Sequence, residues 1–147
     1  MKKGLRIFLI AMMMISVSSV VYAEREEYKE LNKKLALLYK NGNIIGAIDV
    51  AKEAVEVAKE TFGANHIYVS ASLNNLAMLY FKNGDYEEAK LNYEKSLSMT
   101  EELVGKTHPK IVKLLEDIKK CCEKLGEKEE IRSIDKRLET LHRMTSG

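Results

Sequence analysis

The sequence predicts an all-α protein made of three stacked helix–turn–helix repeats. Glycines recur at one constant interval, at Gly42, Gly84 and Gly126. A second ladder keeps the same spacing, because residues 62–66 (FGANH) return as residues 104–108 (VGKTH). Between these marks the apolar residues recur at helical spacing and do not alternate as in a half-buried strand. A regular period of this length indicates supersecondary units that stack and share one continuous core.

Each repeat contains two amphipathic segments. In the middle copy one helix face carries the i, i+3, i+4, i+7 series of Leu73, Leu76, Ala77 and Tyr80. The glycine turns and the linkers between copies interrupt the pattern, and the single proline, Pro109, follows a linker. Because the connections are short, neighbouring helices should run antiparallel in pairs. The expected helices span residues 26–40, 44–61, 67–82, 85–103, 109–125 and 128–142.

The predicted repeat domain covers residues 24–142, with copies at about 26–65, 66–107 and 108–142. One amphipathic pair cannot bury its apolar face alone, and three stacked pairs are about the minimum for stability. The last helix has a narrow apolar stripe among charged residues, which is typical of a capping helix with one solvated face. Residues 143–147 are expected to form a disordered tail.

Residues 1–23 have the layout of a secretory signal peptide. Three basic residues precede an apolar run, and small residues lead to Ala23, after which we expect cleavage. The prediction is therefore an exported protein, either periplasmic or secreted. The alternative is an uncleaved anchor in the inner membrane. The apolar stretch at residues 7–23 includes three serines and is shorter than the roughly 20 apolar residues that a spanning helix needs, so we expect no stable membrane insertion after cleavage.

Removal of this segment changes the charge balance. The whole chain has 24 basic and 22 acidic residues, and three of the basic ones lie in residues 1–23. The remaining 21 basic and 22 acidic residues argue against a nucleic-acid partner, because nucleic-acid-binding proteins usually carry a basic excess. The sequence also lacks a glycine-rich phosphate-binding loop, and we expect no cofactor.

The two cysteines, Cys121 and Cys122, are adjacent. Neighbouring Cα atoms lie about 3.8 Å apart, whereas a disulfide prefers about 5.5–6 Å, so a bond between them would be strained. No third cysteine or histidine lies nearby at metal-ligand spacing, and we expect no metal site. The pattern predicts one cysteine in the core and one partly exposed. The alternative is an intermolecular disulfide in an oxidising compartment.

The three histidines do not indicate catalysis. His66 and His108 are repeat equivalents at the starts of helices, which favours a structural role in the linkers, and His142 lies near the end of the last helix. None has a nearby grouping of serine, cysteine or carboxylate that could form a nucleophile and base. We therefore expect no catalytic residues and no enzyme activity.

The middle copy resembles a tetratricopeptide repeat. The series Leu73, Leu76, Ala77, Tyr80 fits the first helix of that repeat, and Ala89 with Tyr93 fits its second helix. The 42-residue length and residues 105–109 (GKTHP) resemble the kinesin light chain type. The first copy fits loosely. In the third copy Lys119 and Cys122 replace Ala77 and Tyr80, which suggests a divergent cap. The resemblance implies a short right-handed solenoid with a concave groove lined by the first helix of each pair.

The resemblance also implies that peptides lie in this groove, held by asparagine and lysine side chains. Asn75 is the best match, since an amide can donate to and accept from a peptide backbone at once. The groove leans basic, which would favour an acidic segment or a free carboxylate. Its expected residues are Lys29, Asn32, Lys33, Lys40, Asn74, Asn75, Met78, Phe81, Lys82, Lys113 and Lys120.

Simpler interpretations stay open for these residues. The lysines could form only a solvated face, Asn75 could make a hydrogen bond that packs two helices, and Met78 and Phe81 could belong to the core. The function that the sequence predicts is an exported adaptor or scaffold that binds a protein or peptide. The alternative is a self-assembling module of the cell envelope, a homo-oligomer formed through apolar residues left uncovered on the first helix, including Leu31, Leu35 and Leu38.

Overall fold

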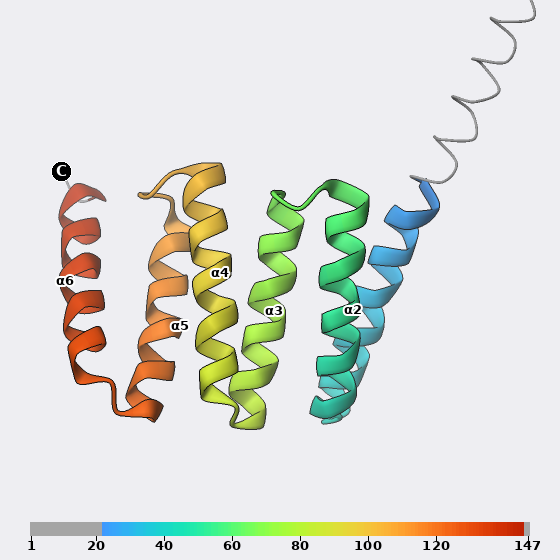
Figure 1. Cartoon of the computed structure of the whole chain (residues 1–147), viewed down its shortest axis with the longest axis horizontal. Coiled ribbons are helices and arrows are strands. Elements are labelled where there is room, and N and C mark those ends of the chain that lie inside the picture. The colour runs from blue at the N-terminus through green and yellow to red at the C-terminus, as the bar shows by residue number, and fades with distance from the viewer. Residues whose placement is uncertain (1–21, 146–147) are drawn as a thin grey trace, which may run out of the picture.

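The computed structural model describes residues 22–145, and this part of the chain is an all-α stack of six helices (Figure 1). A first helical segment covers residues 22–40. It is followed by α2 (Ile44–Phe62), α3 (Ile67–Asn83), α4 (Tyr86–Val104), α5 (Pro109–Leu125) and α6 (Lys128–Thr145). The predicted fold class is confirmed, because successive helices pack side by side as three pairs.

The helix bounds differ from the predicted ones mainly at the ends of the chain. The predicted signal peptide lies outside the described residues except at positions 22 and 23, which are helical. Residues 143–145 continue α6, although we expected a disordered tail from residue 143. Between residues 22 and 145 no helix is long and apolar enough to cross a membrane.

The glycine ladder marks a turn that is repeated three times. Gly84 has φ +95° and ψ 2°, in the left-handed region, where a residue with a Cβ is strained. Its backbone N–H and that of Asp85 donate to carbonyls of the last turn of α3, which is how such a helix end is satisfied. Gly42 and Gly126 have φ of +75° and +76°. No atom within 4 Å would meet a Cβ at Gly84, so glycine is required there by backbone conformation and not by crowding.

The recurring histidines are helix caps. His66 Nδ1 accepts a hydrogen bond from the Tyr68 backbone N–H at 3.2 Å, and His108 Nδ1 accepts one from the Lys110 N–H at 3.2 Å. Each bond satisfies one of the backbone donors that a helix leaves free at its N-terminus. The structural role expected for both residues is confirmed.

The core depends on small residues where helices meet. Ala47, Ala58, Ala77 and Ala89 are fully buried. Between α3 and α4 the buried contact is polar, because Ser70 Oγ lies 3.0 Å from Ser96 Oγ and 2.7 Å from Thr100 Oγ1. Ser96 and Thr100 also donate to backbone carbonyls. Hydroxyls of this size let two helices approach closely while each polar atom keeps a partner.

Two leucines of the first helix are not available for self-assembly. Leu31 and Leu35 are 8% and 7% exposed and belong to the core formed with α2 and α3. Leu38 is partly buried against the same core. The expectation that they remain uncovered was wrong, because the apolar stripe of the first helix faces inward onto the next two helices. The exposed hydrophobic side chains of this region include Leu37, Tyr39 and Ile45 instead.

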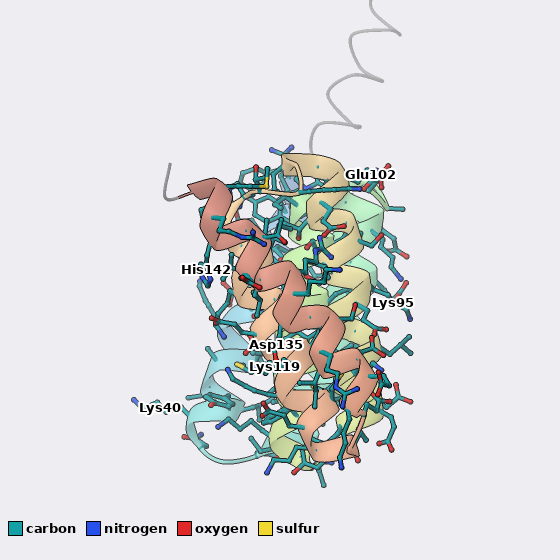
Figure 2. The ribbon with its side chains drawn as sticks, turned by 90° about the vertical axis from the view of Figure 1, so that its left-hand side faces the viewer. Lys40, Lys95, Glu102, Lys119, Asp135 and His142 are labelled. Carbon is teal, nitrogen blue, oxygen red and sulfur yellow. The ribbon has the colours of Figure 1, made fainter. Side chains whose placement is uncertain are left out.

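The last helix is attached by ion pairs as well as by its apolar stripe. Lys119 Nζ of α5 lies 2.6 Å from Asp135 Oδ1 of α6 (Figure 2). Arg137 of α6 pairs with Glu101 of α4. Lys90 of α4 reaches Glu127 and Glu130 at 2.6 and 3.1 Å. Ile134 and Leu141 supply the buried apolar contacts of α6. The last helix therefore covers the end of the stack with its apolar stripe and also forms ion pairs with α4 and α5.

Replacing His66 with alanine should lower the free energy of unfolding by about 1 kcal/mol, because the cap of α3 loses its acceptor. His66→Asn keeps a side-chain acceptor at the same position and should retain most of the stability. Both variants lose the imidazole ring, so their difference isolates the cap. Urea unfolding followed by circular dichroism measures it, and equal stability of the two variants would contradict the capping role.

Replacing Lys90 with methionine should destabilise the chain by about 1 kcal/mol, because its ion pairs with Glu127, just before α6, and with Glu130 of α6 are lost. Its side chain is 16% exposed, while its two carboxylate partners are 38% and 44% exposed, so screening by water keeps the effect modest. Lys95→Met, on the exposed side of the same helix (Figure 2), is the matched control and should be neutral. The comparison is made by urea unfolding at low and high salt, and a deficit that does not shrink with salt would speak against the ion pairs.

Candidate binding groove

A pocket of about 290 Å³ lies between α3 and α5. Six of the residues that line it were predicted for the groove from the sequence. Four of them belong to α3 and two are lysines of α5. The residues that line it are Asn74, Met78, Phe81, Lys82, Tyr93, Lys113, Asp117 and Lys120. Met78 and Phe81 are half-buried and pack against the core, as the packing interpretation predicted, and their contact with a ligand stays a prediction.

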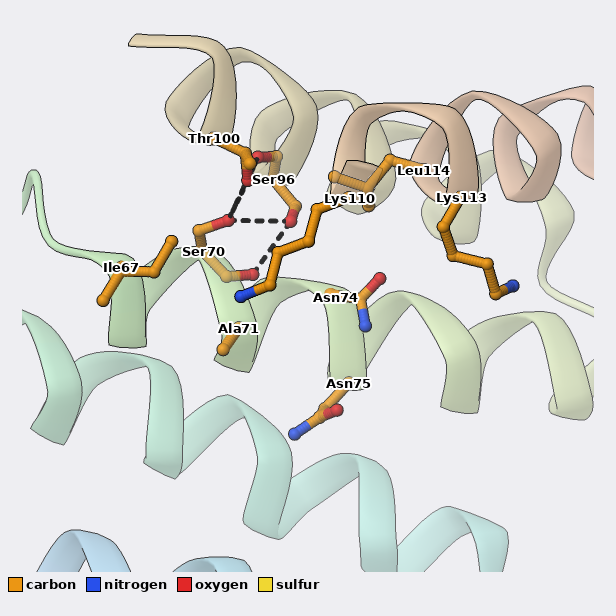
Figure 3. Close-up of a pocket in the computed structure, with 10 residues that line it drawn as sticks. All are labelled: Ile67, Ser70, Ala71, Asn74, Asn75, Ser96, Thr100, Lys110, Lys113 and Leu114. Carbon is orange, nitrogen blue, oxygen red and sulfur yellow. Dashed lines mark hydrogen bonds between the residues drawn. The ribbon is translucent and has the colours of Figure 1, made fainter. Parts of the chain in front are cut away.

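A second pocket of about 190 Å³ adjoins the first, because both are lined by Asn74 and Lys113 (Figure 3). Its residues are Ile67, Ser70, Ala71, Asn74, Asn75, Ser96, Thr100, Lys110, Lys113 and Leu114. We call the two pockets together the α3–α5 groove. The hydrogen-bonded hydroxyls of Ser70, Ser96 and Thr100 lie in its wall, as the dashed lines in Figure 3 show.

The side-chain amides of Asn74 and Asn75 are available for hydrogen bonding to a ligand. Within residues 22–145 neither makes a hydrogen bond, and both side chains are half-buried. By contrast, Asn32 and Asn92 each donate to the carbonyl four residues earlier in their own helix, at 2.8 Å. The alternative in which Asn75 packs two helices through a hydrogen bond was therefore wrong. An amide without a partner can both donate to and accept from an incoming backbone.

The charge of the groove is basic but partly compensated. Asp117 Oδ2 lies 2.6 Å from Lys113 Nζ, and its Oδ1 lies 2.9 Å from Lys120 Nζ. The hydrogen bond to Asp117 raises the pKa of Lys120 and keeps it charged. Lys82 and Lys110 have no ion pair within the described part of the chain. Four lysines and one aspartate thus line the groove, which suits a negatively charged occupant.

The residues predicted from the first copy lie elsewhere. Lys29 and Lys33 pair with Glu26 and Glu30 of their own helix and are 62% and 72% exposed. Asn32 is bonded within the helix, and Lys40 points away from the stack at the end of the first helical segment (Figure 2). None of the four lines the α3–α5 groove. For Lys33 and Lys40 the structure agrees with the simpler interpretation of a solvated face, whereas Lys29 lines a different pocket.

Several residues that line the groove were not selected from the sequence, among them Ser70, Tyr93, Ser96, Thr100 and Lys110. The signal that could have pointed to Ser70, Ser96 and Thr100 is their position on the buried faces of helices. A buried hydroxyl usually has a hydrogen-bond partner nearby, so hydroxyls on two adjacent helices indicate a polar contact between them. Lys110 follows Pro109 at the start of α5, and a charged residue at a helix start gives no indication of the surface that it faces.

Both cysteines are buried and free, so the expectation of one partly exposed cysteine was wrong. Adjacent residues point to different sides of a helix, and α5 is covered on two sides because α4 and α6 both pack on it. Burial raises the pKa of Cys121 to about 11 and that of Cys122 to about 12. Such thiols are protonated near neutral pH and are not placed to form a bond between two molecules.

One group of side chains has the composition of a metal site. Cys122, Glu127 and Glu130 place their ligand atoms within 4.8 Å of one another. The ammonium of Lys90 lies 2.6 and 3.1 Å from the two carboxylates, and its hydrogen bond lowers the pKa of Glu127. The Lys90 ammonium therefore already neutralises these carboxylates. The clustering of the three side chains is accounted for by the ion pairs that hold α6 against α4.

The tetratricopeptide repeat profile matches residues 31–102 and again residues 68–143. The chain belongs to the tetratricopeptide repeat family. Tetratricopeptide repeats generally mediate protein–protein interaction. The resemblance inferred from the middle copy is thereby confirmed.

Several known proteins resemble this tetratricopeptide repeat chain. It is 34% identical over 64 residues to the clustered mitochondria protein homolog of Homo sapiens and 36% identical to that of Xenopus tropicalis. Each match covers 44% of this chain and only 5% of the relative.

Solved structures show the same architecture. BtubC (BKLC) from P. vanneervenii has a TM-score of 0.74 at 18% identity, with 82% of this chain and 48% of that chain covered. A Podosopora anserina kinesin light chain structure with nearly identical TPR-like repeats has a TM-score of 0.68 at 18% identity, with 80% and 55% covered. At this identity the likeness concerns the fold, and it agrees with the kinesin light chain type of repeat expected from the sequence.

The two buried thiols should react slowly with a thiol reagent at neutral pH in the folded chain and rapidly in denaturant, because burial suppresses the thiolate. Ser98→Cys, at an exposed position of α4, adds a control thiol that should react at once. The labelled residues are identified by mass spectrometry of peptides. Fast native labelling of Cys121 or Cys122 would show that α6 does not stay packed on α5.

Proposed function

We propose that this chain is an exported adaptor that binds an extended, acidic segment of a partner protein in the α3–α5 groove. The observation that supports this best is that six of the residues expected in the groove line one pocket of about 290 Å³. They are Asn74, Met78, Phe81, Lys82, Lys113 and Lys120. Family membership adds a general tendency to mediate protein–protein interaction.

The chemistry of recognition follows from the uncommitted groups. An extended peptide has backbone N–H and C=O groups that face outward, and the amides of Asn74 and Asn75 can bond both kinds. Met78 and Phe81 offer an apolar surface to a side chain of the segment. Lys82 and Lys110 would attract carboxylates along its length. Binding should therefore weaken as salt rises.

The proposed location rests on the sequence. Residues 1–23 have the basic, apolar and small-residue order of a signal peptide, and on this basis we place the adaptor in the periplasm or outside the cell. The same hypothesis gives it no catalytic role and no nucleic-acid partner.

The variant Asn74→Ala/Lys113→Ala changes the two residues shared by both pockets. It should weaken binding of acidic peptides selected by display against the wild-type chain by about 1–3 kcal/mol, which is roughly fivefold to 150-fold. Fluorescence polarisation with the selected peptides measures the dissociation constant.

The matched control is Lys95→Ala, which removes an exposed lysine outside both pockets and should leave the affinity unchanged. Circular dichroism establishes that the double variant is folded. If a folded Asn74→Ala/Lys113→Ala chain bound every selected peptide as the wild type does, the groove would not be the binding site.

A further inference from the structure

A separate pocket of about 350 Å³ lies where the first helical segment meets the junction of α2 and α3. The loop of this junction is at the upper edge of the stack in Figure 1. We call it the junction pocket, and it is lined by Arg25, Tyr28, Lys29, Phe62, His66 and Tyr68. The centroid of Phe62 lies 4.6 Å from that of Tyr68, 5.3 Å from that of His66 and 5.4 Å from that of Tyr28. Four aromatic rings therefore gather at one opening.

The turn itself does not need these aromatic residues. The junction of α4 and α5, one repeat later, has Val104 in place of Phe62 and Lys110 in place of Tyr68. Its glycine has φ +89°, against +93° at the first junction, and its histidine caps the next helix with the same 3.2 Å bond. The second junction thus forms the same turn and cap without the rings of Phe62 and Tyr68, and these two aromatic residues at the first junction call for another explanation.

Two polar groups of the junction pocket are available to a ligand. Tyr68 is 47% exposed, and its hydroxyl has no hydrogen-bond partner among residues 22–145. The hydroxyl of Tyr28, in contrast, is used internally, 3.0 Å from Ser72 Oγ. The guanidinium of Arg25 stands 5.8 Å from the Phe62 ring centroid and makes no ion pair within the described residues. The pocket offers ring surface, one free phenolic donor and one unpaired positive charge.

We propose that the junction pocket binds a proline-containing, extended segment of a partner protein that carries an acidic residue beside the proline. Proline-rich segments adopt a polyproline II conformation whose carbonyls have no internal partner, and such segments dock on aromatic-lined grooves. The Tyr68 hydroxyl donates to one of those carbonyls. Arg25 pairs with the acidic side chain, for which a guanidinium is well suited. A cationic occupant is disfavoured by Arg25 and Lys29.

This site differs from the α3–α5 groove. Ile67 lines the groove and Tyr68 lines the junction pocket, so the first turn of α3 separates the two surfaces. The proposal does not rest on the function assigned to the groove.

The test uses the full chain and a labelled synthetic peptide with a Glu-Pro-Pro-Glu centre. Two matched peptides replace both prolines with alanine or both glutamates with lysine. Fluorescence polarisation should show binding of the first peptide and an affinity at least about tenfold weaker for each of the others.

The double variant Phe62→Val/Tyr68→Lys gives the first junction the residues of the second, and it should weaken binding of the Glu-Pro-Pro-Glu peptide about tenfold. Tyr68→Phe, which removes only the hydroxyl, should weaken it roughly threefold to fivefold, and this variant serves if the double variant does not fold. Asn74→Ala/Lys113→Ala should bind this peptide as the wild type does.

Three results would overturn the proposal: no binding of the Glu-Pro-Pro-Glu peptide to the wild-type chain, equal binding of the alanine peptide, or unchanged affinity of folded Phe62→Val/Tyr68→Lys or Tyr68→Phe. If the peptide instead lost its affinity only in Asn74→Ala/Lys113→Ala, it would be a ligand of the groove. That outcome would reject the junction pocket while supporting the proposed function.

Discussion

The close packing of α3 against α4 is the constraint on which the rest of the structure depends. Ala77 and Ala89 are fully buried where these helices meet, and larger side chains there would push the pair apart. Toward one end of the same contact, hydrogen bonds take the place of apolar packing. The hydroxyls of Ser70, Ser96 and Thr100 bond to one another and to backbone carbonyls of the two helices. With α3 fixed in this way, its remaining faces meet the first pair of helices on one side and border the α3–α5 groove on the other.

The sequence was sufficient for the architecture because the determining signals are local. A glycine with positive φ ends a helix by itself, and a histidine caps the next helix through a bond to a nearby backbone N–H. Both signals recur at the interval of the repeat, so the helix pairs and their order could be predicted without any knowledge of long-range contacts.

The candidate site was predictable only in part, because it depends on which side chains meet across helices. Asn74, Met78 and Lys113 were expected in the groove and do line it. Asn32 was expected on the same surface, yet its amide bonds to the Tyr28 carbonyl in its own helix. Helical periodicity assigns a residue to a face but does not decide whether its polar atoms are already used. The hydroxyl wall of the groove was missed for a related reason, since short polar side chains give a weak periodic signal.

Asp117 has a consequence for how selective the groove can be. Its carboxylate already holds Lys113 and Lys120 at 2.6 and 2.9 Å, so a ligand that approaches these lysines would compete with a resident group for the same donors. Binding would then be an exchange of ionic partners, in which much of the attraction is cancelled by what is given up. A single carboxylate would gain little, whereas several in sequence could also reach Lys82 and Lys110. Because Asp117 competes for these lysines, the affinity of the groove would depend on how many negative charges a ligand carries, and a single charge would add little.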